Sequence, residues 1–182
     1  MKNPIPYFIT IIITFIIFVG ILFYSYIFKL GYFPKVTYLM FFLVIILIIL
    51  NVFNNTKNLN YFSFWTILFI LFLYAFTDKF FHLHNLLGAY LNLGTDGGTI
   101  VQTTYLISFL LIIAFFNKFL TEQYKKNPHW LYLFIFAYFL SVIGVISDFV
   151  YHNKIEDYFE LFSLYFFASA FLLILISKRE IK

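Results

Sequence analysis

The sequence contains no cysteine, and only 11% of its residues are charged. The missing thiols exclude disulfide bonds, thiolate metal ligands and a cysteine nucleophile. The chain also lacks a Walker loop, an HExxH or GxSxG sequence and a dinucleotide-binding glycine pattern. Nucleotide chemistry and the common hydrolase sites therefore have no support. An arginine-rich voltage-sensor stripe and a TVGYG-like ion filter are absent as well.

Apolar and aromatic residues make up most of the chain instead. Of its 182 residues, 63% are hydrophobic and 25% are aromatic. A water-soluble domain of this length cannot bury so much apolar surface, so the composition predicts an integral membrane protein surrounded by lipid. The formal net charge of +4 lies mostly at the ends of apolar runs, which indicates orientation rather than a nucleic-acid partner. The abundance of Phe, Ile, Asn, Lys and Tyr suits an AT-rich bacterial genome, so we expect the bacterial inner membrane.

Charged and turn-forming residues divide the chain into six long apolar runs. About 20 apolar residues cross the hydrocarbon layer as an α-helix. We therefore predict an all-α bundle of six transmembrane helices that forms a single domain over residues 1–182. The first run is too long for the core of a signal peptide and lacks a cleavage site of small residues. The expected spans cover residues 7–28, 36–53, 61–77, 99–117, 129–150 and 157–177.

The distribution of Lys and Arg predicts the orientation. With a cytoplasmic N-terminus, eight of the 12 Lys and Arg residues fall on the cytoplasmic side. Because cytoplasmic loops carry the excess of positive charge, we expect both termini in the cytoplasm. Trp65 and Trp130 would then lie at the cytoplasmic boundary, where aromatic belts form. The four cations on the outer side are Lys29, Lys35, Lys79 and Lys154.

Two similar hexapeptides end the third and fifth runs. TDKFFH covers residues 77–82, and SDFVYH covers residues 147–152. Both runs cross in the same direction, so these segments should meet on the extracytoplasmic side, where EDYFEL at 156–161 opens the sixth run. The topology therefore gathers acids and histidines from three distant segments. The candidate site residues are Asp78, His82, His84, Asp148, His152, Glu156 and Glu160.

Helical spacing places several of these side chains on common faces. Residues four apart share one face of a helix. The small residues Ala137, Ser141 and Gly144 share a face with Asp148 and allow another helix to approach closely, so we expect this face to point into the bundle. The pairs at this spacing are Asp78 with His82, Asp148 with His152, and Glu156 with Glu160.

A structural reading accounts for part of the pattern. Glu156 and Asp157 open a helix, where the dipole favours negative charge and Asn153 can act as N-cap, so capping explains them before function does. Glu160 lies one turn deeper, and capping does not explain it. An ionisable cluster in a membrane indicates function by default, but packed bundles also use such groups to link helices. Ion pairs with Lys79 or Lys154, or hydrogen bonds with Tyr, would favour the structural reading.

At these residues the second half of the chain resembles a loose group of uncharacterised bacterial multi-pass membrane proteins. The pattern of that group has Asp-Glu at an outer helix end and His-Glu six residues later. It continues with Gly-Ala-x-x-Glu in a later helix and Glu-Glu-x-Leu-Glu at the start of the last helix. The corresponding stretches here are LYAFTDKFFHLHNLLG at 73–88, GVISD at 144–148 and EDYFEL at 156–161.

The resemblance implies a site position but no particular reaction. It favours His84 as the participating imidazole, six residues after Asp78. These two side chains can meet only if the helix breaks near residues 79–83, because a separation of six does not share a helix face. Lys79 and Asn85 stand where the group has Glu, so an activity common to the group would be altered or lost in this chain.

The first of three candidate functions is a site for a divalent metal or for a polar or lipid ligand. Carboxylates with neutral imidazoles suit zinc, or iron and manganese when oxygen ligands dominate. Glu156 would then be the catalytic residue that transfers protons at metal-bound water, in a membrane hydrolase or transferase. The sequence leaves open whether the protein is an enzyme. The expected metal ligands are Asp78, His82, His84, Asp148, His152 and Glu160.

Two further functions need no catalysis. One is a structural or accessory subunit, such as a defence or immunity component, whose Phe-rich faces bind a protein partner or a second copy of the chain. The other is ion- or proton-linked transport through the acid cluster. Transport needs further polar residues that continue the path through the inner half of the membrane. The sequence offers only Asn51 and Asn117 there.

Overall fold

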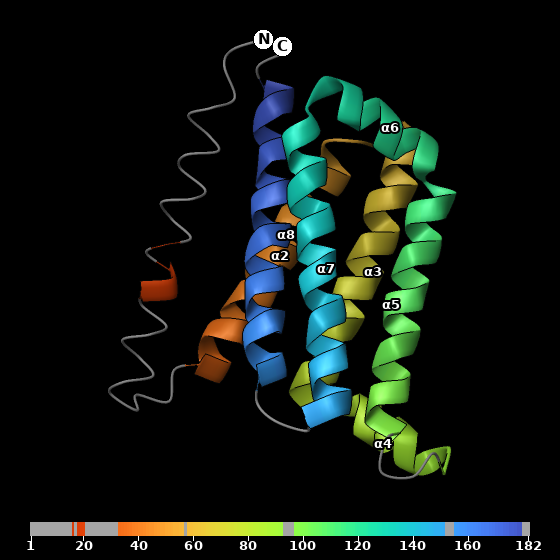
Figure 1. The fold of residues 1–182 in the computed structure, drawn as a ribbon. Coiled ribbons are helices and arrows are strands. Elements are labelled where there is room, and N and C mark those ends of the chain that lie inside the picture. Colours follow the sequence, from red (N-terminus) through yellow and green to blue (C-terminus); the bar gives the residue numbers. More distant parts are fainter. Residues whose placement is uncertain are drawn as a thin grey trace.

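A computed structural model gives the fold (Figure 1). It describes residues 16, 18–20, 33–56, 58–92, 97–151 and 155–179. These residues form helices joined by short turns, and the described part of the chain contains no strand, which confirms the all-α prediction. The helices are α2 (Phe33–Phe53), α3 (Leu59–Phe81), α4 (Leu83–Tyr90), α5 (Gly97–Phe115), α6 (Asn117–Lys126), α7 (Pro128–Tyr151) and α8 (Ile155–Arg179).

Four of these helices are long and apolar enough to cross a membrane. The qualifying stretches are Lys35–Phe53, Leu59–Phe81, Pro128–Ser147 and Ile155–Ile176. A fifth span results if α5 and α6, which meet at a bend of 67°, are taken as one unit. Large apolar side chains cover the outer faces of the helices, as Leu39, Phe42 and Ile46 do on α2. Such continuous apolar surface is stable in lipid rather than in water.

The long helices alternate in direction along the bundle (Figure 1). Helices α3 and α7 finish at the same end, next to α4, and α5 and α8 begin there. Helix α6 crosses the opposite end. We refer to these as the α4 end and the α6 end. The end of α3, the end of α7 and the start of α8 therefore lie at one end of the bundle, as the topology predicted.

The observed boundaries agree with the expected spans within four residues, but two expected connections contain helices. The expected span at 7–28 lies largely outside the described residues. Residues 83–90 form α4, and residues 117–126 form α6. Helix α6 forms because Phe119, Leu120 and Gln123 are buried on one side while Lys118 and Thr121 are exposed, a helical pattern too short and too polar to span lipid.

Aromatic side chains fill the centre of the bundle. The ring of Phe167 on α8 lies 5.2 Å from that of Phe72 and 5.4 Å from that of Phe134. Trp65 and Trp130 also belong to this core, with only 0% and 1% of their surfaces exposed. The prediction of an interfacial belt for these two residues is therefore wrong, because the bundle encloses both indoles. The orientation then depends on the count of Lys and Arg alone.

Small residues bring α7 close to α8. A Cβ atom added at Gly144 would lie 3.3 Å from the Cβ of Phe159, a tight contact. Three residues earlier on the same face, the hydroxyls of Ser141 and Ser163 are 2.6 Å apart, and Ala137 is fully buried. This confirms that the face with Ala137, Ser141 and Gly144 points into the bundle, where small side chains permit close packing.

Candidate functional site

A cavity of about 780 Å³ lies within the bundle towards the α4 end. Helices α2, α3, α4, α5, α7 and α8 all contribute to its wall. Four of the seven predicted site residues line it, so the bundle does bring these distant segments together. Those four are Asp78 and His82 from the end of α3, and Glu156 and Glu160 from the start of α8.

The wall changes from charged or polar to apolar along three helices. On α3, Asp78 and Lys79 line the cavity near the end of the helix, and Leu71 and Phe72 line it two turns earlier. On α8 and α5 the same gradient runs in the opposite chain direction, because these helices begin at the α4 end. Along α8 the lining residues are Glu156, Asp157, Glu160, Ser163, Leu164 and Phe167, and along α5 they are Gln102, Tyr105, Leu106 and Phe109.

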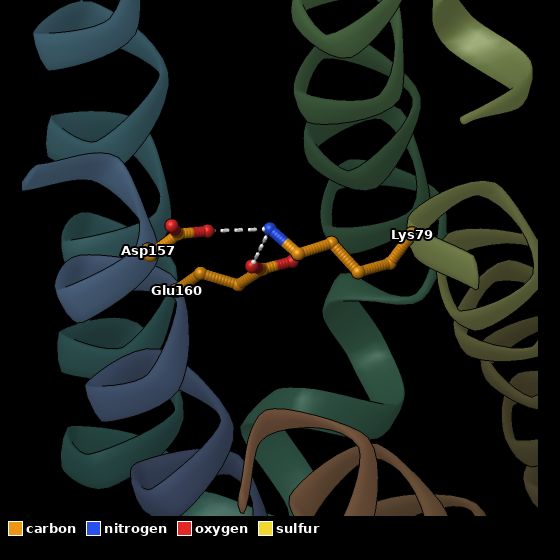
Figure 2. Close-up of polar contacts among 3 residues, drawn as sticks. All are labelled: Lys79, Asp157 and Glu160. Carbon is orange, nitrogen blue, oxygen red and sulfur yellow. Dashed lines mark hydrogen bonds and ion pairs between the residues drawn. The ribbon is translucent and has the colours of Figure 1, made fainter. Parts of the chain in front are cut away.

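Lys79 joins α3 to α8 across the charged end of the cavity. Its Nζ donates a hydrogen bond to Asp157 Oδ1 at 2.7 Å and forms an ion pair with Glu160 Oε2, also at 2.7 Å. Figure 2 shows the ammonium group between the two carboxylates, which α8 presents from adjacent turns. The three side chains keep 24%, 31% and 30% of their surfaces exposed, so water or headgroups still screen the pair.

The local sequence explains why these groups converge. Asp157 and Glu160 are three residues apart in the first turns of α8, so both face the same side. Lys79 lies in the last turn of α3, where the negative end of the helix dipole favours a cation. Its long apolar stem allows the ammonium to reach a neighbouring helix.

A break at His82 separates α3 from α4. His82 adopts the left-handed conformation, with φ of 52° and ψ of 43°, which is unusual for a residue with a side chain. It caps α3, and its own carbonyl accepts a bond from the backbone N–H of Asn85 at 3.1 Å. The break falls within residues 79–83, where the meeting of Asp78 with His84 requires one.

The structure describes the side chains of four of the seven predicted site residues and leaves three undescribed. Asp78 is buried, with 6% of its surface exposed, while His82 is exposed at the cavity wall. Glu160 contacts Lys79. His152 lies outside the described residues, as do the side chains of His84 and Asp148, although the backbone at both positions is helical. Among the side chains that are described, no group of three His, Asp or Glu is arranged to hold a metal ion.

Hydroxyl groups line the cavity beyond the charges. The hydroxyl of Tyr105 on α5 donates to that of Tyr74 on α3 at 2.6 Å, and their rings meet edge to face at 5.0 Å. Tyr138 on α7 donates to the carbonyl of Leu106 at 3.1 Å. These contacts place several polar atoms between the charged end and the aromatic core.

The sequence pattern understates the importance of two residues. It marks Lys79 mainly as a departure from a motif and only secondarily as a counter-ion, and it assigns Asp157 to helix capping. Its position in the first turn of α8 is consistent with capping, yet its side chain also binds Lys79. One feature of the sequence could have predicted this ion pair: Lys79 follows Asp78 at the same predicted membrane boundary at which EDYFEL begins.

The chain matches no family model, no curated protein and no solved structure. The function must therefore be inferred from the geometry of the site.

Proposed function

We propose that this protein binds an amphiphilic, lipid-like ligand in the cavity between its helices. The observation that carries this proposal is the gradient from charged or polar to aromatic lining residues, which begins with charged side chains on α3 and α8 and with Gln102 on α5. A ligand with a polar head and an apolar chain matches such a wall. The cavity volume of about 780 Å³ is within the range of small-molecule sites.

The packing at the α6 end argues for a closed site rather than a transport path. Phe72, Phe109 and Phe167 line the apolar part of the cavity. Beyond them, towards the α6 end, Phe134, Phe171 and Trp65 are buried in ring contacts. Asn51, further towards the α6 end, donates to backbone carbonyls of Leu47 and Phe171 at 2.9 and 3.3 Å. These contacts support a structural role for Asn51, and ion- or proton-linked transport has the weaker case.

Metal binding remains a prediction. The described geometry supports an amphiphile better, since Glu160 is already paired with Lys79. Metal analysis of the purified protein tests zinc, iron or manganese directly, and a stoichiometric metal lost on Asp148→Asn would favour the metal site over the ligand proposed here. Catalysis by Glu156 depends on that result.

A structural or accessory subunit is the second candidate. The observation in its favour is Lys79, which compensates Asp157 and Glu160 without any ligand. The exposed aromatic side chains Phe42, Phe115 and Phe139 would contact the partner or a second copy. Co-purification of a stoichiometric partner, with normal behaviour of Glu160→Gln, would support this function instead.

We further propose the six-span topology with both termini in the cytoplasm, in a bacterial inner membrane. The four to five candidate spans among the described residues and the eight-to-four division of Lys and Arg along the sequence support it. The charged end of the cavity would then face the outside, so the ligand would enter from the outer leaflet or the extracytoplasmic space.

Native mass spectrometry of the full chain in maltoside micelles tests ligand binding. We expect a bound amphiphile, either co-purified or added, and we expect Ala75→Phe to displace it, because Ala75 lines the cavity. The matched control is Ala114→Phe, which adds the same ring on the exposed face of α5. Equal occupancy in the two variants, with both folded, would rule the cavity out as the binding site.

A further inference from the structure

The formal charges on the cavity wall are strongly unbalanced. Four carboxylates line it: Asp78, Glu156, Asp157 and Glu160. Among the described lining residues, Lys79 is the only Lys or Arg. Without counting His82, the described lining residues therefore carry a formal charge of −3, from −4 and +1. Such a charge attracts a cation and repels an anion.

The ammonium group of Lys79 is already paired with carboxylates of the protein and is therefore poorly placed to bind an anionic ligand. It lies 2.7 Å from oxygens of both Asp157 and Glu160, so an anionic headgroup would have to break these contacts to reach it. An anion would also approach Asp78, which is buried in the same wall. Both effects disfavour a phosphate, sulfate or carboxylate head.

The wall also offers aromatic faces to the ligand. The tyrosine rings on the cavity wall add faces on which a cation is stabilised. Oxygen Oε2 of Glu160 is buried and lies 2.7 Å from Lys79 Nζ, so this atom is already paired within the protein.

From these observations we infer that the ligand of this cavity has a cationic, ammonium-type head. This inference depends on the amphiphile-binding function proposed above and specifies the chemistry of its head. The head lies at the charged end among Asp78, Glu156 and Glu160, and the chain extends towards Phe72, Phe109 and Phe167.

Matched single-chain probes test the inference. Binding of dodecylammonium and dodecylsulfonate to the full chain is measured in maltoside micelles, which carry no competing charged head. We expect dodecylammonium to bind at least about tenfold more tightly, the effect of roughly one net charge interaction at a partly exposed site. Asp78→Asn and Glu156→Gln should each reduce this preference several-fold, while both variants still unfold cooperatively.

Glu122→Gln is the matched control. Glu122 lies on α6 at the opposite end of the bundle, where it accepts a hydrogen bond from Tyr61, and its substitution should leave the preference unchanged. Equal binding of both probes, or tighter binding of the sulfonate, would overturn the cationic head but keep the binding function. Failure of both probes to bind at the cavity would overturn the binding function itself.

Discussion

Lys79 is the residue on which the charged end of the bundle depends. Its ammonium compensates two carboxylates of α8 and links that helix to α3. Breaking a buried ion pair leaves an uncompensated charge behind, which costs more than the pair itself contributes.

We expect Lys79→Met to lower the free energy of unfolding by about 1–3 kcal/mol, less than for a fully buried pair because the side chains keep about a quarter to a third of their exposure. The methionine keeps the apolar stem but leaves Asp157 and Glu160 repelling each other. Thermal unfolding in micelles followed by circular dichroism measures the loss.

Two comparisons make that measurement specific. Combining Lys79→Met with Asp157→Asn and Glu160→Gln should restore most of the stability, since no uncompensated charge remains. Lys125→Met, on the exposed side of α6, should have little effect. A Lys79→Met protein as stable as Lys125→Met would mean that the cation contributes nothing to the fold.

At the scale of the helices, the contact between α7 and α8 determines the shape of the cavity. Gly144 belongs both to this contact and to the cavity wall. The close approach depends on a missing side chain, so its disruption should affect stability and binding together. Helix propensity alone would instead favour alanine at this position.

Gly144→Leu should therefore destabilise the bundle by about 1–3 kcal/mol, the usual cost of overpacking, and weaken ligand binding. Gly144→Ala should have a much smaller effect, because the Cβ contact at 3.3 Å needs a shift of only a few tenths of an ångström. Ile146→Leu, on the exposed face of α7, is the control. Unfolding temperatures of the three variants give the order, and a harmless Gly144→Leu would contradict the close contact.

For the whole molecule, the orientation in the membrane decides which compartment the charged end faces. The chain has no cysteine, so single cysteines can be introduced without background. Ala89 on α4 and Thr121 on α6 are both exposed and lie at opposite ends of the bundle. In intact cells we expect an impermeant maleimide to label Ala89→Cys and to leave Thr121→Cys unlabelled until the membrane is permeabilised. The reverse labelling pattern would mean that the charged end of the cavity faces the cytoplasm.

Much of this architecture followed from local pattern, and the exceptions have physical causes. Helices α2, α3, α7 and α8 were recognised because long apolar runs need no tertiary information to be read as spans. Helices α4 and α6 are not evident as spans because α4 has only eight residues and α6 is short and polar. Trp65 and Trp130 were misassigned because hydropathy does not tell an indole that faces lipid from one that faces other helices.

The sequence by itself determined that this is an all-helical chain suited to lipid, and it predicted that acids from distant segments meet at one end of it. These properties depend on composition, spacing and the direction of successive runs. Only the tertiary structure decided that Asp78, Glu156 and Glu160 share one cavity, that Lys79 spans it, and that aromatic rings close it. Such features depend on the rotation of each helix about its axis, which packing against neighbours determines and a single apolar run does not encode.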